Sequence, residues 1–140
     1  VDVLSGRLAY TYTRLLDRLL LVGAVSVSMT CAADVPSFDL CAVLSEVRPN
    51  GTVYNFTQGY IHVKPGQETQ PLTFLLQPTC ISLPSGHRLR LSLSAACFPA
   101  YPVNAGTGEP VGEARLIDQQ IITITVEPIA SYLHLPVPLT

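Results

Sequence analysis

The chain has 140 residues, of which 48% are hydrophobic and 13% charged, and its formal net charge is −2. This length is typical of one domain that buries a substantial core, while charged residues make up about half the share found in an average soluble domain. Lys64 is the one lysine and the sequence has no basic cluster, which argues against a nucleic-acid partner. The longest nearly apolar run, residues 19–29, is too short to cross a bilayer, so we expect no membrane partner either.

The first segment with two interpretations is residues 13–21. The spacing of its leucines would allow two turns of amphipathic helix. Gly23 follows immediately, and the alternation after it belongs to a strand. We therefore favour the non-helical interpretation.

Alternation with period two dominates the rest of the chain. Residues 24–30 alternate apolar with small polar side chains, and residues 121–126 alternate isoleucine and valine with threonine. Residues 87–94 place leucines on one face and arginines and serines on the other. This is the pattern of half-buried strands, and the β-branched residues that strands favour are frequent in it.

Turn residues separate these runs. Arg48-Pro49-Asn50-Gly51 joins the run 40–47 to the run 52–56, and Asn-Gly between apolar runs is a strong hairpin signal. Further turns are expected at residues 64–67 and 83–86, and residues 99–112, rich in Gly and Pro, predict a long loop. About eight strands result, at a spacing typical of an all-β sandwich or barrel.

The cysteines, Cys31, Cys41, Cys80 and Cys97, show neither Cys-x-x-Cys spacing nor a histidine at ligand distance. We therefore expect no metal and no cofactor. Each cysteine lies in or beside an apolar run, so we interpret all four as buried thiols, although two disulfides would be open to a secreted protein. The first residue is valine and no signal peptide follows it, so we expect an excised piece of a longer, cytoplasmic protein.

Catalytic patterns are missing from the sequence. A serine hydrolase needs an activated nucleophile with a base within reach, and the chain has no Gly-x-Ser-x-Gly motif. Ser85 and His87 are close in sequence, but neighbours at a turn do not face each other as a catalytic pair. The acidic residues show none of the pairing that a glycosidase needs. We therefore expect no catalytic residue in this chain.

The aromatic residues allow one alternative. Tyrosines on the predicted strands are expected to pack in the core or in an interface. Exposed aromatics can instead stack on sugar rings, and the long loop offers Tyr101, Asn104 and Glu109 as a ligand or interface site. With such a site the chain would be an independent carbohydrate-binding module.

Ordered motifs along the chain resemble one protein family. Residues 38–51 (FDLCAVLSEVRPNG) and 54–59 (YNFTQG) are similar to the signature DF…L.DV.PDG….N.T.G, and residues 84–91 (PSGHRLRL) are similar to PGHRIRL. Residues 98–108 resemble FP…N.NTG, and residues 131–137 (SYLHLPV) resemble S.L.LPV. These motifs are those of the C-terminal non-catalytic domain of X-Pro dipeptidyl-peptidase and cocaine-esterase-like serine hydrolases. Ser45 and Glu46 stand where the family has Val-Asp, and Ser85 where it has Pro.

The resemblance implies both a fold and a role. The fold would be a galactose-binding-like jelly-roll β-sandwich over residues 1–140, attached in the parent protein to an α/β-hydrolase domain that holds the Ser-Asp-His triad. No catalytic residue of the family falls in this chain. The implied function is an accessory domain that packs on the catalytic domain of the same parent chain and helps to shape its substrate cleft. The parent would be a dipeptidyl-peptidase, esterase or acylase, and the other alternative is a structural domain that forms a homo-oligomer.

Overall fold

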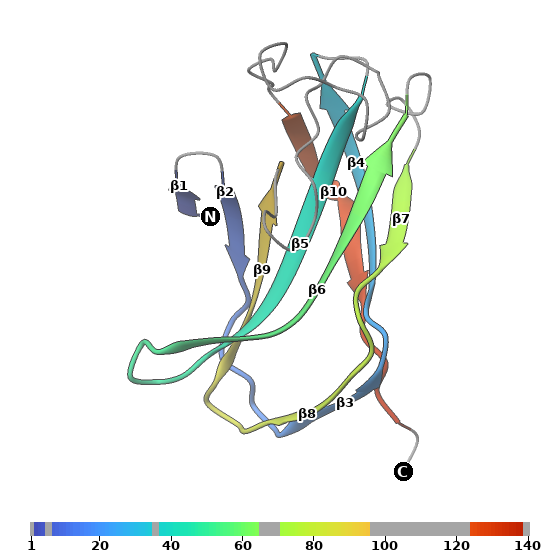
Figure 1. Cartoon of the computed structure of the whole chain (residues 1–140). Helices are drawn as coiled ribbons and strands as arrows, with labels where there is room; N and C mark the ends of the chain where they lie inside the picture. The colour runs from blue at the N-terminus through green and yellow to red at the C-terminus, as the bar shows by residue number, and fades with distance from the viewer. Residues whose placement is uncertain (1, 5–6, 35–36, 65–70, 96–123, 139–140) are drawn as a thin grey trace.

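The computed structural model describes the chain apart from residues 1, 5–6, 35–36, 65–70, 96–123 and 139–140 (Figure 1). The described part contains ten strands and no helix. In chain order they are β1 (Asp2–Leu4), β2 (Arg7–Thr11), β3 (Leu19–Gly23), β4 (Ser26–Ala33), β5 (Phe38–Val47), β6 (Val53–Val63), β7 (Leu72–Leu75), β8 (Thr79–Leu83), β9 (Arg88–Ser94) and β10 (Ile124–His134).

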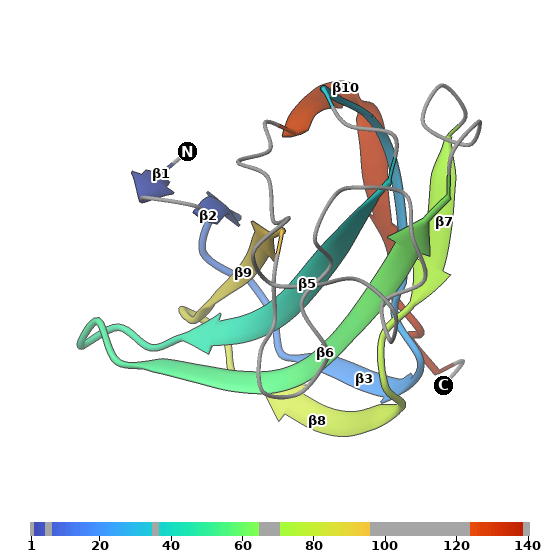
Figure 2. The same cartoon turned by 45° about the horizontal axis from the view of Figure 1, so that its top comes forward.

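The strands form two facing layers (Figures 1 and 2). One is a five-stranded sheet of order β1-β2-β9-β5-β6, and the other is a three-stranded sheet of order β10-β4-β7. Every pairing among these strands is antiparallel. The all-β class predicted from the alternation is confirmed, with antiparallel sheets packed as a sandwich.

The pair β3–β8 closes one end of the sandwich, at the bottom of Figure 1. Its strands continue the β4–β7 ribbon past a bend, where the amide of Leu76 donates to the carbonyl of Val25 over 2.9 Å. The amide of Val22 donates to the carbonyl of Pro136, also over 2.9 Å. The segment after β10 is thereby tied to β3.

The structure also decides between the two interpretations of residues 13–21. Residues 12–18 form neither helix nor strand, and β3 begins at Leu19, so the helical interpretation is wrong.

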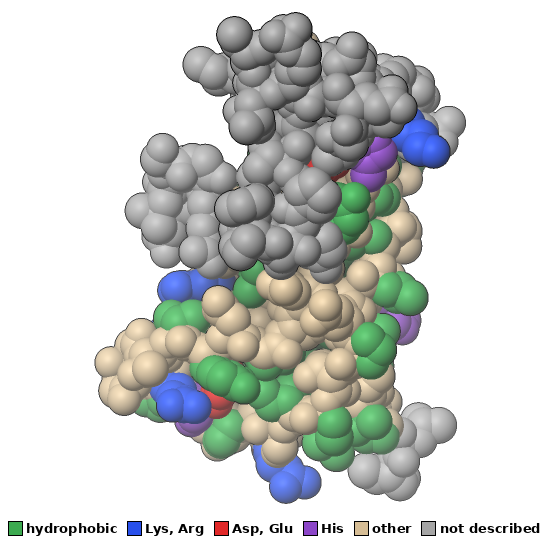
Figure 3. Space-filling view, in the orientation of Figure 1, with side chains coloured by type: hydrophobic (Ala, Val, Ile, Leu, Met, Phe, Trp, Pro, Cys, Tyr) green, Lys and Arg blue, Asp and Glu red, His purple; other side chains and the backbone are tan. Residues whose placement is uncertain are grey.

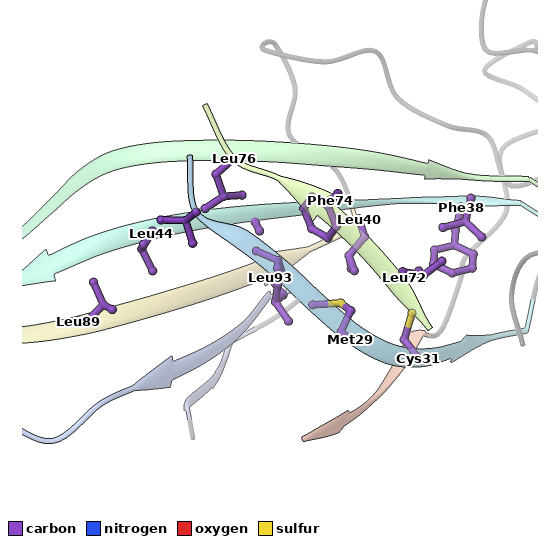
Figure 4. Close-up of a cluster of buried hydrophobic side chains, with 14 of the residues drawn as sticks. Met29, Cys31, Phe38, Leu40, Leu44, Leu72, Phe74, Leu76, Leu89 and Leu93 are labelled. Atoms are coloured by element: carbon purple, nitrogen blue, oxygen red, sulfur yellow. The ribbon is translucent and has the colours of Figure 1, made fainter. Parts of the chain in front are cut away.

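The core lies between the two layers (Figure 4). Met29 and Cys31 of β4 and residues of β7 approach it from one side, and leucines of β5 and β9 from the other. Phe38 and Leu44 are completely buried, and burial of a side chain of this size stabilises the fold by roughly 1.5–3 kcal/mol. The leucine face predicted for residues 87–94 is confirmed, since Leu89 and Leu93 belong to the core.

Strand β5 occupies an interior place in the five-stranded sheet, between β9 and β6. Its inward residues join the core, but Asp39, Cys41 and Ser45, which alternate with them, are also at most 4% exposed. A strand that is buried on both faces has no room for an unpaired charge. The two acidic residues of β5 therefore need partners.

None of the described elements is a helix long and apolar enough to cross a membrane.

Candidate functional site

The site residues suggested by the sequence cannot be placed. Tyr101, Asn104 and Glu109, together with Cys97, lie outside the described residues. The polar groups that the described strands bring together are instead two histidine–carboxylate pairs, one near each end of β5.

The first pair lies at the end of β5 that leads into the β5–β6 hairpin. Glu46 is 6% exposed, and its Oε1 lies 2.5 Å from Nδ1 of His87, the residue just before β9. Its second oxygen, Oε2, lies 3.8 Å from Nε of Arg48. A buried carboxylate is tolerated when it is paired and hydrogen-bonded in this way. The pair also ties the turn before β9 to the end of β5.

Arg48 extends this arrangement to the surface. Its guanidinium carbon lies 6.0 Å from the ring centroid of Tyr54, at the outer limit of a cation–π contact. The Arg48 side chain is half exposed, and Tyr54 is exposed as well. A chain of contacts therefore runs from the half-buried ring of His87 through Glu46 and Arg48 to Tyr54 on the hairpin.

The hairpin that carries Arg48 and Tyr54 projects away from the sandwich (Figures 1 and 2). The amide of Arg48 donates to the carbonyl of Thr52, and the amide of Gly51 donates to the carbonyl of Arg48, both over 2.9 Å. Gly51 has a φ of 86°, a conformation that glycine adopts without strain. The tight turn predicted from Asn50-Gly51 is confirmed.

The second pair lies near the start of β5. Asp39 is 4% exposed, and its Oδ1 lies 2.7 Å from Nδ1 of His62, its register partner on β6. Within the described residues, no three or more His, Cys, Asp or Glu side chains gather in a way that could hold a metal ion. Both pairs give hydrogen-bond partners to carboxyl groups that β5 buries, and neither arrangement by itself suggests a reaction centre.

The interpretation of all four cysteines as buried thiols is partly wrong. Cys31 is a buried free thiol, as expected. Cys80 is free but exposed, because it alternates with inward residues of β8, and Cys41 is disulfide-bonded. In a short strand every second side chain points away from the core. Apolar neighbours in sequence therefore do not show whether a cysteine points toward the core or toward solvent.

The two free thiols are expected to differ in reactivity. Burial raises the pKa of the Cys31 thiol, so less of the reactive thiolate is present at a given pH, and the side chain is also inaccessible. In the native protein, Cys80 should react with a disulfide reagent at pH 8 about a hundred times faster than Cys31. Stopped-flow absorbance of the wild type and of Cys80→Ser measures this, and a fast phase that survives in Cys80→Ser would contradict the assignment.

The sequence did contain a signal for the histidine–carboxylate pairs. Asp39 and Glu46 are the charged residues within the apolar run of β5, and a charge inside a buried strand predicts a partner. Which residues are the partners depends on strand order and register, and neither follows from alternation.

Comparison with known proteins adds the family. The family model of the X-Pro dipeptidyl-peptidase C-terminal non-catalytic domain matches residues 3–134 of this sequence. A search of curated proteins finds no match.

Solved structures share the fold. An α-amino acid ester hydrolase superposes with a TM-score of 0.83 at 21% identity, over 95% of this chain and 26% of that chain. An aminopeptidase from a marine sediment Thaumarchaeota archaeon has a TM-score of 0.84 at 14% identity, over 96% and 26%. A CocE/NonD family hydrolase from Staphylococcus aureus has a TM-score of 0.66 at 16% identity, over 94% and 30%.

This chain therefore spans about a quarter of the length of the ester hydrolase and of the archaeal aminopeptidase. The family match covers nearly all of the sequence, and it agrees with the ordered motifs at residues 38–59, 84–91 and 131–134. The chain belongs to the family of X-Pro dipeptidyl-peptidase C-terminal non-catalytic domains.

Proposed function

We propose that this chain is the accessory domain of a larger serine hydrolase, that it packs on the catalytic α/β domain of the same parent chain, and that it helps to shape the substrate cleft. The substrates of the parent would be acyl esters, amides or N-terminal X-Pro dipeptides. The observation behind the proposal is the match to a non-catalytic domain family over residues 3–134.

Two further observations support this role. In the α-amino acid ester hydrolase and the archaeal aminopeptidase, the matched fold makes up about a quarter of the chain. The acidic residues of β5 that the structure places are engaged by histidines at 2.5 and 2.7 Å, which suits a structural module. A jelly-roll topology over residues 1–140 stays a prediction, as does a cytoplasmic location, which the disulfide at Cys41 disfavours.

The isolated chain is expected to hydrolyse neither a chromogenic ester nor an X-Pro anilide above the rate in buffer. Full-length parent protein, prepared in parallel, should hydrolyse at least one of the two. Hydrolysis by the isolated chain that survives a second purification would contradict the accessory role. A second experiment tests the packing with a parent protein that is truncated to end just before Val1 and so lacks this domain. The truncated protein should have a lower melting temperature and a changed KM. Unchanged values of both would refute the role in stability and cleft shape.

A further inference from the structure

Arginines gather at the end of the molecule that carries the β5–β6 hairpin. The residues are Arg14 and Arg18 in the loop after β2, Arg48 in the hairpin, and Arg88 and Arg90 at the start of β9. Figure 3 shows Lys and Arg side chains (blue) on the hairpin and at the bottom of the molecule. The acidic residues within the same segments are Asp17 and the buried Glu46. This end is therefore basic, although the whole chain has a net charge of −2.

Hydrogen bonds and an ion pair tie these segments together at one end of the sheet. The amide of Leu15 donates to the carbonyl of His87 over 2.9 Å, and the amide of Gly86 donates to the carbonyl of Leu15 over 2.8 Å. The contacts of Glu46 with His87 and Arg48 connect the hairpin to the same turn. We call the surface formed by residues 12–18, 48–55 and 84–88 the arginine end.

The arginine end also exposes large apolar side chains. Leu16 is 92% exposed and Tyr12 is 72% exposed, and Val53 and Tyr54 are exposed on the hairpin. Tyrosine and arginine are the residue types enriched in protein interfaces and in their energetic centres. Exposed leucine and tyrosine side chains in the same segments as arginines give this end a composition that favours an interaction surface.

The rival surface is the outer face of the β10-β4-β7 sheet. It exposes Leu75, Tyr132 and His134, its central strand carries Ser26, the buried Ser28 and Thr30, and the described side chains in these three strands that point outward include no Lys, Arg, Asp or Glu. The described part of this face therefore offers fewer charged groups than the arginine end. The arginine end offers both charge and apolar contact, and electrostatic complementarity is what gives an interface its specificity.

We propose that the arginine end docks on an acidic surface of the hydrolase catalytic domain, with Leu16 and Val53 as apolar contacts and Arg14 and Arg88 as cations that meet carboxylates; the strand registers place Val53 and Arg88 on the same face of the sheet. This inference rests on the proposed function, and it adds the face of the domain and the chemistry of the partner. Arg48 is held by Glu46 and lies over Tyr54, so the hairpin that carries Val53 is ordered before docking, which lowers the entropic cost of association. A polyanion is a poorer fit because the chain has a net charge of −2 and one lysine.

Hydrogen exchange tests the proposal in the full-length parent protein. Amides of residues 13–18 and 52–55 should exchange about tenfold more slowly in the parent than in the isolated 140-residue chain, because docking suppresses local opening. The variant Arg14→Gln/Arg88→Gln should return these amides to the rates of the isolated chain. Neither side chain makes an ion pair within the described residues, and circular dichroism of the isolated variant checks that the fold is kept.

The matched control is Leu75→Glu/Thr125→Glu, which changes the net charge by the same amount on the rival surface and should leave the protection at residues 13–18 intact. Protection at β7 and β10 in place of the arginine end would overturn this inference while leaving the packing role in place. Protection nowhere would refute the packing role itself. Binding of the isolated chain to a DNA oligonucleotide or to phosphatidylserine vesicles at physiological salt, lost in Arg14→Gln/Arg88→Gln, would assign the surface to a polyanion and also overturn the inference.

Discussion

Replacing Glu46 with glutamine is expected to lower the free energy of unfolding by about 2 kcal/mol, the usual contribution of a hydrogen bond to a charged group. The carboxylate is 6% exposed and holds His87 at 2.5 Å and Arg48 at 3.8 Å. An amide of the same size keeps the shape but removes the charge that both partners meet. The turn before β9 loses its charged anchor on β5, so the loss reaches the centre of the five-stranded sheet.

Urea denaturation followed by circular dichroism measures this change. Arg48→Gln is the control, because its side chain is half exposed and an exposed ion pair contributes at most about 1 kcal/mol. A double-mutant cycle with His87→Gln should show a coupling energy of about 1–3 kcal/mol between the ring and the carboxylate. A loss below about 0.5 kcal/mol in Glu46→Gln, within the range of ordinary surface substitutions, would show that the pair is not an anchor.

Adding a single methyl group at Gly59 is expected to destabilise the fold by about 3 kcal/mol, the upper end of the usual cost of overpacking. Gly59 lies on β6, where a Cβ atom would stand 2.7 Å from the carbonyl oxygen of Leu75 and 2.9 Å from the Cα of Leu76. Both are backbone atoms that cannot rotate away. Gly59→Ala must therefore push β6 away from the segment after β7, at the edge where the two layers meet.

The matched control for Gly59→Ala is Gly86→Ala. Gly86 has a φ of 85° and no atom within 4 Å of an added Cβ, so alanine there suffers only the backbone strain of about 1–2 kcal/mol. Thermal unfolding should rank Gly59→Ala clearly below Gly86→Ala, and both below the wild type. Equal melting temperatures for the two variants would mean that the layers separate at Gly59 without cost.

Alternation was enough to predict several strands and their inward faces. Leu89 and Leu93 on β9, and Val27 and Met29 on β4, all belong to the core as the period-two pattern requires. The Asn50-Gly51 hairpin was equally predictable, because a tight turn needs a residue that tolerates positive φ, and Gly51 supplies it. These features depend only on residues near one another in sequence.

Features that depend on distant strands were not predictable in the same way. The partners of Asp39 and Glu46 are 23 and 41 residues away, and they follow from the order β9-β5-β6 that alternation leaves open. The exposure of Cys80 depends on which face of β8 turns toward the core, and its register partner on β3, Val22, is exposed as well. The arginine end is similar, since Leu15 joins residues 12–18 to the turn before β9, and Glu46 joins that turn to the hairpin through His87 and Arg48.

The pairing of β4 with β10 joins an early and a late part of the chain, and this affects folding while the protein is being synthesised. The amide of Thr30 donates a hydrogen bond to Oγ of Ser131, which lies 101 residues further along the chain, and β2 pairs with the late strand β9. During synthesis an edge of β4 stays open until almost the whole domain has emerged, and open edges are where chains aggregate. Pairings over such separations also form slowly. The synthesis and pairing of β10 should therefore determine how long the new chain is exposed to aggregation.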